Sequence, residues 1–307
     1  MLGRRRFLQQ AGLLGLLAHA PFAVNAKDTI SRRIARTKEF VPAIGMGTWR
    51  TFDVGGQSHA IGKRVEILQR FFEMGGQMID SSPMYGTSQV VLGQCLAAFE
   101  KDRDKEKPSP FTATKVWTPG RSFGIRQMKN SADLWGVQKF DLMQVHNLLD
   151  WETHLETLQQ WRADGKVRYI GVTTSHGRRH EKLEAIMRQK SIDFVQLTYN
   201  LLDREVEQRL LPLALERGIS VIVNRPLQGS LLFDRARGKP LPPWAVEFDC
   251  ENWAQFFLKF VISHRAVTCA IPATSRLDHM TENMGAISGA LPNPKHRRQM
   301  VTFYRDL

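Results

Sequence analysis

The chain has 307 residues, enough to bury one large core, and this length allows either one α/β barrel or two smaller domains. The formal net charge is +13 at pH 7, but Lys and Arg are scattered, without zinc-ligand spacing, an RNA-recognition signature or a basic helix. This favours a solvated basic surface over nucleic-acid binding. Cys95, Cys250 and Cys269 lie far apart, outside any CxxC pair, so we predict neither a disulfide framework nor a metal site.

The first 26 residues have the pattern of an export signal. A basic start containing Arg4-Arg5 resembles a twin-arginine signal, and the apolar run that follows is too short to span a bilayer comfortably. Val24 and Ala26 are small residues at the −3 and −1 positions of a cleavage site. We therefore expect a twin-arginine-type signal peptide over 1–26, read by the twin-arginine export machinery. The mature protein, 27–307, is then a single periplasmic domain; an uncleaved N-terminal membrane anchor is the alternative.

After a possible hairpin over 28–42, short apolar runs alternate with amphipathic segments. The strand candidates are 43–49, 75–80, 111–116, 141–146, 168–173, 193–199, 219–224 and 269–272. The helix candidates, in which apolar residues recur at helical spacing, are 62–74, 91–99, 123–135, 151–164, 179–189, 204–217, 250–263 and 278–287. The charged run 100–107 predicts a solvated loop or helix end. The chain stops about twenty residues after the last predicted helix, so we expect an open pocket without long C-terminal loops.

Near-continuous apolar strands separated by amphipathic helices indicate a parallel sheet that helices cover on the outside. Eight such units predict closure into an (α/β)8 TIM barrel. A doubly wound open sheet is the alternative, but it calls for a GxGxxG turn after an early strand, which this sequence lacks.

Four polar residues follow the ends of these strands: Asp80, Tyr85, Lys115 and His146. Each one alone has a structural explanation, as a turn former, a loop aromatic, a salt-bridge partner or a core histidine. The carboxyl ends of parallel barrel strands meet at one face of the barrel, where catalytic groups come from several strands. Together the four residues therefore predict one site.

In this order and at these spacings, the four residues resemble the catalytic tetrad of the aldo-keto reductases. The supporting stretches are 45–49, 79–86, 113–116, 141–147, 171–174, 195–200 and 271–283. The resemblance implies an (α/β)8 barrel that binds NADP(H) more often than NAD(H), without a Rossmann motif. It also implies that the protein is a monomer with a small carbonyl or alcohol substrate. The enzyme would reduce an aldehyde or ketone to an alcohol, or catalyse the reverse oxidation.

Carbonyl reduction needs a hydride on carbon and a proton on oxygen. By the resemblance, Tyr85 is the general acid, and we expect the Lys115 ammonium to lower the pKa of Tyr85. Asp80 keeps Lys115 protonated by pairing with it. His146 orients the carbonyl oxygen as a hydrogen-bond donor and assists its protonation.

The resemblance also gives candidate cofactor contacts residue by residue. They are Gly47, Thr48, Asp80, Thr173, Thr174, Gln196, Asn224, Arg225, Pro226, Leu227, Gly229, Thr274, Ser275, Arg276, Glu282 and Asn283. Thr174 replaces the Asn that the family often has there, and Asn224 replaces an aromatic that stacks on the nicotinamide in many members. The segment 226–230 resembles a loop over the pyrophosphate, whose backbone N–H groups can bind phosphate.

At the adenosine end, Ala273 and His279 stand where many NADP-selective members have Lys and Arg. Arg276 is expected to replace the missing charge, so NADP(H) remains the expected cofactor. Trp49, Trp117 and Trp151 each follow a strand end, where they either ring the substrate mouth or pack at the barrel rim.

Two other functions are consistent with a barrel. A nicotinamide-binding regulatory or redox-sensing subunit with little turnover is the second hypothesis. A sugar-binding or hydrolytic barrel needs two carboxylates at strand ends, and only Asp80 is placed convincingly there. Because an exported cofactor supports one turnover before it must be recycled, an enzyme that cycles a bound cofactor between two substrates fits the export signal.

Overall fold

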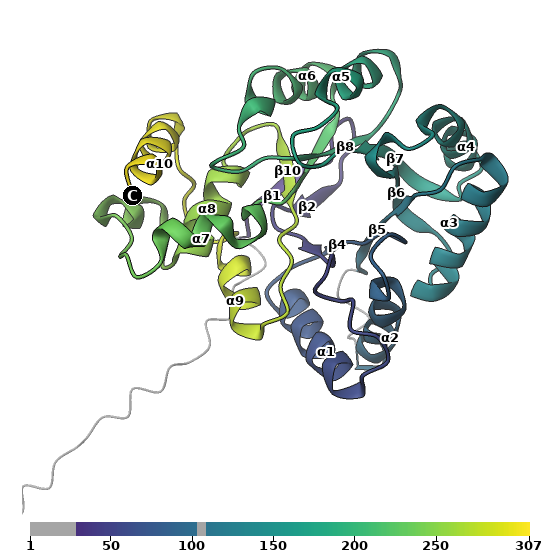
Figure 1. Cartoon of the computed structure of the whole chain (residues 1–307), viewed down its shortest axis with the longest axis horizontal. Coiled ribbons are helices and arrows are strands. Elements are labelled where there is room, and N and C mark those ends of the chain that lie inside the picture. Colours follow the sequence, from purple (N-terminus) through teal and green to yellow (C-terminus); the bar gives the residue numbers. More distant parts are fainter. Residues whose placement is uncertain (1–28, 103–108) are drawn as a thin grey trace, which may run out of the picture.

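The computed structural model describes residues 29–102 and 109–307 (Figure 1). The predicted signal over 1–26 and the part of the charged run from residue 103 onward lie outside the described residues. The strands are β1 (Ser31–Arg33), β2 (Phe40–Pro42), β3 (Met46–Gly47), β4 (Met78–Asp80), β5 (Phe111–Val116), β6 (Phe140–Val145), β7 (Val167–Thr173), β8 (Phe194–Thr198), β9 (Ser220–Asn224) and β10 (Val267–Ala270). The helices are α1 (Ser58–Glu73), α2 (Ser88–Asp102), α3 (Arg121–Trp135), α4 (Trp151–Ala163), α5 (His180–Gln189), α6 (Leu210–Arg217), α7 (Leu231–Ala236), α8 (Trp253–Ile262), α9 (Leu277–Gly285) and α10 (Pro294–Asp306).

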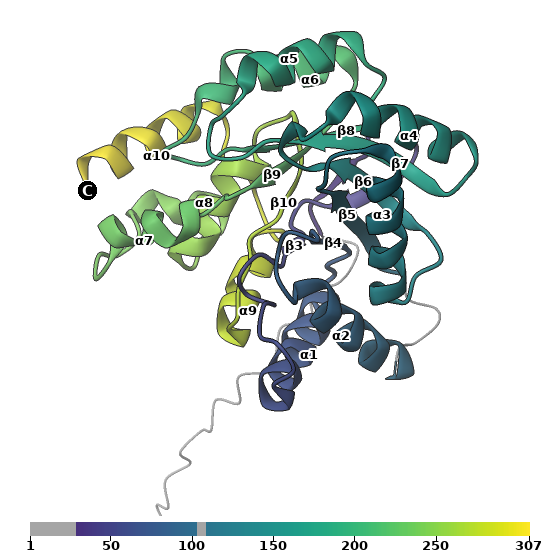
Figure 2. The same cartoon turned by 45° about the vertical axis from the view of Figure 1, so that its right-hand side comes forward.

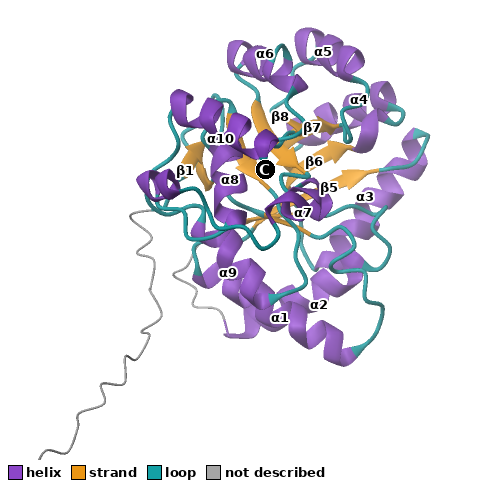
Figure 3. Ribbon diagram, turned by 60° about the vertical axis from the view of Figure 1, so that its left-hand side comes forward, coloured by secondary structure: helices purple, strands orange, loops and turns teal. Residues whose placement is uncertain are grey.

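Strands β3 to β10 form one eight-stranded sheet in sequence order, with every neighbouring pair parallel. The sheet closes on itself where Ile44 pairs with Ala270, and Gly45 N–H donates to the Ala270 carbonyl at 2.8 Å. A Cβ at Gly45 would lie 2.8 Å from the Met78 carbonyl, so only glycine fits this seam. Helices surround the strands (Figures 1 and 3), and the predicted (α/β)8 TIM barrel is confirmed.

Alternate side chains of the strands face the inside of the barrel. The interior cluster contains Met78, Phe111, Leu142, Phe194 and Ile222, whereas intervening residues such as Ile79 and Val195 pack in the larger cluster shared with the helices. Two residues further along β4, β6, β8 and β9, the inward position is polar, being Asp80, Gln144, Gln196 and Asn224. This register explains why the carboxyl ends of the strands carry functional groups while the opposite end is apolar.

The hairpin expected over 28–42 is present as the antiparallel pair β1 and β2. Ile34 and Val41 are fully buried and belong to the interior cluster, so the hairpin closes the apolar end of the barrel. All three cysteines are free and buried.

Two helices were not expected from the sequence. The helix α7 lies in the Gly- and Pro-rich segment 225–243, and α10 follows the helix that was predicted to be the last. Asn293 caps α10 by accepting the Lys295 and His296 N–H groups, each at 2.9 Å. The sequence of α10 is mostly polar and it buries few side chains, Met300 and Tyr304 among them, so it has few apolar residues that could mark it as a helix. Figure 2 shows α10 on the same side of the barrel as α7 and α8.

Within residues 29–102 and 109–307, no helix is both long and apolar enough to cross a membrane. In the same residues, no group of three or more His, Cys, Asp or Glu side chains is arranged to hold a metal ion.

Candidate active site

A cleft of about 410 Å³ opens at the carboxyl ends of the barrel strands. Every barrel strand except β5 contributes, either by its last residues or by the loop that follows it. The lining residues are Gly47, Thr48, Trp49, Arg50, Thr51, Asp80, Met84, Tyr85, His146, Asn147, Thr174, Ser175, His176, Gln196, Asn224, Arg225, Pro226, Leu227, Gly229, Ser230, Ile271, Pro272 and Ala273. Most of the expected site residues therefore meet around one cavity.

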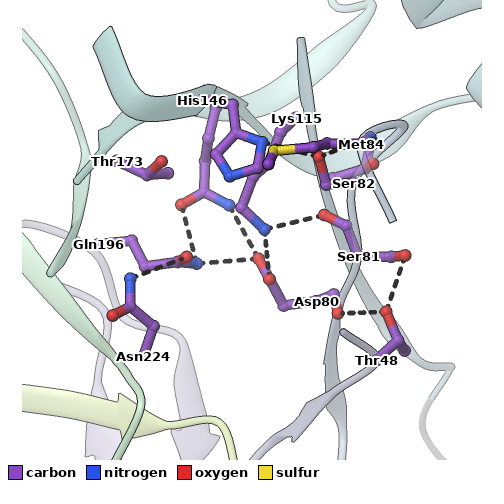
Figure 4. A network of polar contacts seen from close by, with 12 residues as sticks. Thr48, Asp80, Ser81, Ser82, Met84, Lys115, His146, Thr173, Gln196 and Asn224 are labelled. Atoms are coloured by element: carbon purple, nitrogen blue, oxygen red, sulfur yellow. Dashed lines mark hydrogen bonds and ion pairs between the residues drawn. The ribbon is translucent and has the colours of Figure 1, made fainter. Parts of the chain in front are cut away.

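Lys115 and Asp80 form a buried ion pair beneath this cleft (Figure 4). The Lys115 ammonium, which is inaccessible to solvent, also donates to the Ser81 carbonyl at 2.8 Å. The second Asp80 oxygen accepts from the side-chain amides of Gln144 at 3.0 Å and Gln196 at 2.9 Å. Burial lowers the pKa of Lys115, and the Asp80 carboxylate opposes that effect. Asp80 thus has partners on both oxygens, as a buried carboxylate requires.

Gln144 was not among the residues predicted from the sequence. It lies on β6 between Leu142, which faces the barrel interior, and His146, which lines the cleft. Side chains alternate between the two faces of a strand, so a residue two positions from Leu142 and from His146 faces inward as they do. This alternation could have predicted Gln144 as a site residue.

Tyr85 lines the cleft, with its ring centre 5.2 Å from the Lys115 nitrogen and edge-on to the His146 ring at 5.7 Å. The expectation that Lys115 lowers the pKa of Tyr85 is wrong for this structure. Burial, followed by the charge of Asp80, raises the pKa of Tyr85 well above its usual value. The physical reason is that burial disfavours the phenolate, and the Asp80 carboxylate that pairs with Lys115 opposes the effect of the ammonium on Tyr85. Tyr85 is consequently protonated at neutral pH.

His146 is buried at the start of the turn that follows β6, and its Nδ1 atom lies 2.8 Å from the Ser82 hydroxyl. Burial and the nearby Lys115 charge lower the pKa of His146 to about 2. The ring is therefore neutral, and any hydrogen bond to a substrate comes from a neutral N–H group. Nothing in the sequence reasoning pointed to Ser82.

Asn224 lines the cleft, and both ends of its side-chain amide are hydrogen-bonded. Its amide donates to the Thr174 carbonyl at 2.8 Å and accepts from the Thr198 hydroxyl at 2.7 Å. It also lies 3.4 Å from the Gln196 side-chain oxygen. Thr173 does not line the cleft, because its hydroxyl accepts from the Asn147 N–H at 3.0 Å.

The segment after β9 forms one wall of the cleft. Arg225 has a φ of +50°, and its Nε atom is buried without a hydrogen-bond partner. Its carbonyl accepts from the Asn200 amide at 3.0 Å. Pro226, Leu227 and Gly229 line the same wall, as expected.

The residues expected at the adenosine end lie outside the cleft. Thr274 and Ser275 follow Ala273 at its edge, and Glu282 and Asn283 are on α9. The Arg276 side chain forms an ion pair with Asp278 on the protein surface. Arg276, which was expected to replace the missing positive charge at the adenosine end, is therefore already paired with Asp278.

The three tryptophans have different environments. Trp49 lines the cleft and is 37 % exposed. Trp117 is also exposed, with its ring centre 6.5 Å from that of His146. Trp151 is half-buried against the core, so it packs at the rim.

The chain is similar to three curated reductases. It is 27% identical to aldo-keto reductase YhdN of Bacillus subtilis (strain 168) over 230 residues, covering 70% of this chain and 66% of that protein. It is 26% identical to the NADH-specific methylglyoxal reductase of Escherichia coli (strain K12) over 226 residues, covering 62% and 64%. These two matches span slightly less than two thirds of each relative. The L-glyceraldehyde 3-phosphate reductase of Escherichia coli (strain K12) is 23% identical, with coverage of 87% and 90%.

Solved structures share the fold. The holo form of an aldo-keto reductase from Bacillus halodurans superposes with a TM-score of 0.72 at 20% identity, covering 90% of this chain and 96% of that one. An aldo/keto reductase from Klebsiella pneumoniae in complex with NADP and acetate gives 0.69 at 22% identity, covering 90% and 95%. The family model of the aldo/keto reductases matches residues 43–298. The chain therefore belongs to the aldo/keto reductase family.

Proposed function

We propose that this protein is an NADP(H)-dependent oxidoreductase that reduces aldehydes or ketones to alcohols, or catalyses the reverse reaction. The observation that carries the proposal is the convergence of Tyr85, His146 and the Lys115–Asp80 ion pair on one cleft. Family membership supports it, as do the names of two relatives, an NADH-specific methylglyoxal reductase and an L-glyceraldehyde 3-phosphate reductase.

The residues around the cleft fit a nicotinamide dinucleotide. Thr174, Gln196 and Asn224 form a floor of amide and hydroxyl groups suited to the carboxamide, and the unpartnered Arg225 Nε is a donor available beside the wall. The segment 226–230 would hold the pyrophosphate, and residues 274–276 and 282–283 would hold the adenosine end. When bound, the cofactor supplies the hydride for the substrate carbon or accepts it in reverse.

The protein's residues manage the oxygen of the substrate. Tyr85 gives its hydroxyl proton to the carbonyl oxygen; it is protonated at neutral pH, and its raised pKa makes it a weak acid there. His146 donates a hydrogen bond to the same oxygen as a neutral imidazole. The Lys115–Asp80 ion pair places an ammonium and a carboxylate in fixed positions beside the Tyr85 ring. A site with protonated Tyr85 is set for carbonyl reduction, which is the direction we propose at neutral pH.

The preference for NADP(H) over NAD(H) is part of this proposal. Ala273 offers no charge at the cleft edge, so the 2′-phosphate contact falls to Arg276, whose pairing partner Asp278 is exposed. Structures similar to this chain contain NADP or NADPH, whereas one relative is NADH-specific. An exposed ion pair contributes little stability, so Arg276 can turn to a phosphate at small cost.

We also propose that residues 1–26 direct twin-arginine export and that the barrel, 27–307, acts in the periplasm as a monomer with its cofactor bound. The basis is the sequence pattern at the N-terminus. If so, protein purified after native export retains nicotinamide through gel filtration, and mass spectrometry after denaturation identifies it. Protein that leaves the column without the cofactor would contradict cofactor retention.

The enzymatic proposal is tested by titrating NADPH and NADH against intrinsic fluorescence and by following cofactor oxidation with a panel of aldehydes and ketones. We expect tighter binding of NADPH and turnover of at least one carbonyl class. Tight binding without turnover across the panel would favour the redox-sensing alternative. Failure to bind either cofactor would contradict the proposed function.

A further inference from the structure

Ser82 is a buried serine that contacts His146 directly, as Figure 4 shows. Its hydroxyl lies 2.8 Å from His146 Nδ1 and 3.2 Å from the backbone nitrogen of Met84. Ser82 lies between Asp80 and Tyr85 in the loop that follows β4. Among the proposed acid–base residues of the described chain, its hydroxyl is hydrogen-bonded to His146 alone.

The two contacts define the direction of the hydrogen bonds. The Met84 N–H can only donate, so the Ser82 oxygen accepts from it. Within the described residues, the Ser82 hydroxyl proton has one acceptor, which is Nδ1 of His146. If Nδ1 instead carried a proton, a buried hydroxyl would have no acceptor, and an unsatisfied buried donor is costly. Donation from Ser82 to Nδ1 leaves the imidazole proton on Nε2.

The other ring nitrogen is free for substrate. His146 lines the cleft, and across the described ranges no protein group is hydrogen-bonded to its Nε2 atom. The charged and titratable groups that face the ring are Lys115, Asp80 and Tyr85, and the depressed pKa of His146 excludes a doubly protonated ring at neutral pH. A neutral imidazole has only one N–H, so the tautomer decides whether it can donate to a carbonyl oxygen.

We infer that Ser82 is a positioning residue that holds His146 in the tautomer protonated on Nε2, with this N–H directed to the substrate carbonyl. The catalytic consequence rests on the proposed reductase function, whereas the tautomer does not. Ser82 does not line the cleft, and it acts through His146.

The tautomer is measured on the full-length protein labelled with ¹⁵N-histidine, in long-range ¹H–¹⁵N spectra at pH 7. The chain has nine histidines, so the His146 signals are assigned as those missing from His146→Gln. We expect a protonated Nε2 and an unprotonated, hydrogen-bonded Nδ1 in the wild type. In Ser82→Ala the signals should move to a mixture of tautomers, and Ser82→Thr, which keeps the hydroxyl, should restore the wild-type pattern.

The kinetic readout is the kcat of carbonyl reduction at saturating NADPH. We expect a roughly tenfold lower kcat in Ser82→Ala, with an unchanged Kd for NADPH and wild-type kcat in Ser82→Thr. Ser131→Ala is the matched control, because it removes another buried hydroxyl, which accepts from Gln89 at 3.1 Å away from the cleft. It should change neither spectrum nor kcat.

Two results would overturn the inference. The first is a wild-type His146 that carries its proton on Nδ1, and the second is a His146 spectrum that Ser82→Ala leaves unchanged. Because the spectra need no substrate, they decide the inference even if the wild type proves to have no reductase activity. A shifted tautomer with unchanged kcat would refute the catalytic role of Ser82.

Discussion

At the scale of single residues, burial and charge pairing set the protonation of the site. The four predicted residues meet as expected. Asp80, Lys115 and His146 lie at or just after the carboxyl ends of β4, β5 and β6, and Tyr85 lies in the loop that follows β4. The pKa of Tyr85 could not be predicted, because it depends on how completely Asp80 neutralises Lys115 and how much water reaches the ring. Ser82 was missed because a serine contact across 64 positions leaves no local pattern.

A buried histidine, His146, and a partly buried one, His264, make the stability of this protein depend on pH. The pKa is about 2 for His146 and about 4 for His264, both below the ordinary 6.5, because burial disfavours the charged rings. As pH falls below 6.5, the unfolded chain binds protons that the native rings do not, so the free energy of unfolding falls. Each histidine contributes up to about 1.4 kcal/mol per pH unit, over a window that ends near pH 4 for His264 and near pH 2 for His146.

Urea unfolding at pH 8, 6.5 and 5 measures this dependence. The wild type should lose stability between pH 6.5 and pH 5, and His146→Gln should lose less over the same interval. His59→Gln, which replaces an exposed histidine on α1, should keep the wild-type slope. Equal slopes in the wild type and His146→Gln would show that the His146 ring charges freely in the native protein.

At the scale of elements, helix packing places strict demands on a few positions. The helices α2 and α3 approach so closely at Gly93 that a Cβ there would lie 1.8 Å from the Leu134 carbonyl. Gly93→Ala should therefore destabilise the protein by about 1–3 kcal/mol, as overpacking does. Gly62 in α1 is exposed, and a Cβ added there meets nothing within 4 Å. Gly62→Ala should stabilise by about 0.5–1 kcal/mol through better helix propensity.

Chemical denaturation of the two variants checks this pair of opposite effects. A Gly93→Ala protein as stable as the wild type would contradict the close packing of α2 on α3. The sequence predicted both helices from their apolar spacing but could not reveal this contact, which depends on the distance between two helix axes. The helix α10 was missed because its sequence is mostly polar, with few apolar residues to mark a buried face.

At the scale of the whole molecule, the barrel sorts side chains by their position along each strand. Phe111 and Leu142 fill the closed apolar end, and Lys115 and His146 follow at inward positions four residues later. This order was visible in the sequence as apolar runs that end in polar residues, which is why the barrel could be predicted. The cofactor preference could not be settled in this way, because Arg276 is paired with Asp278 by a contact that depends on the local loop conformation.

The central claim is that this barrel delivers a proton from Tyr85 to a carbonyl oxygen while a bound nicotinamide delivers the hydride. The most direct measurement compares the kcat for NADPH-dependent carbonyl reduction in the wild type and Tyr85→Phe at saturating cofactor, with the NADPH Kd of both proteins determined in parallel. Loss of the hydroxyl removes the proton donor and leaves the ring contacts in place. The account predicts a fall in kcat of about 10²- to 10⁴-fold with an unchanged Kd. A Tyr85→Phe protein that turns over at the wild-type rate would contradict it.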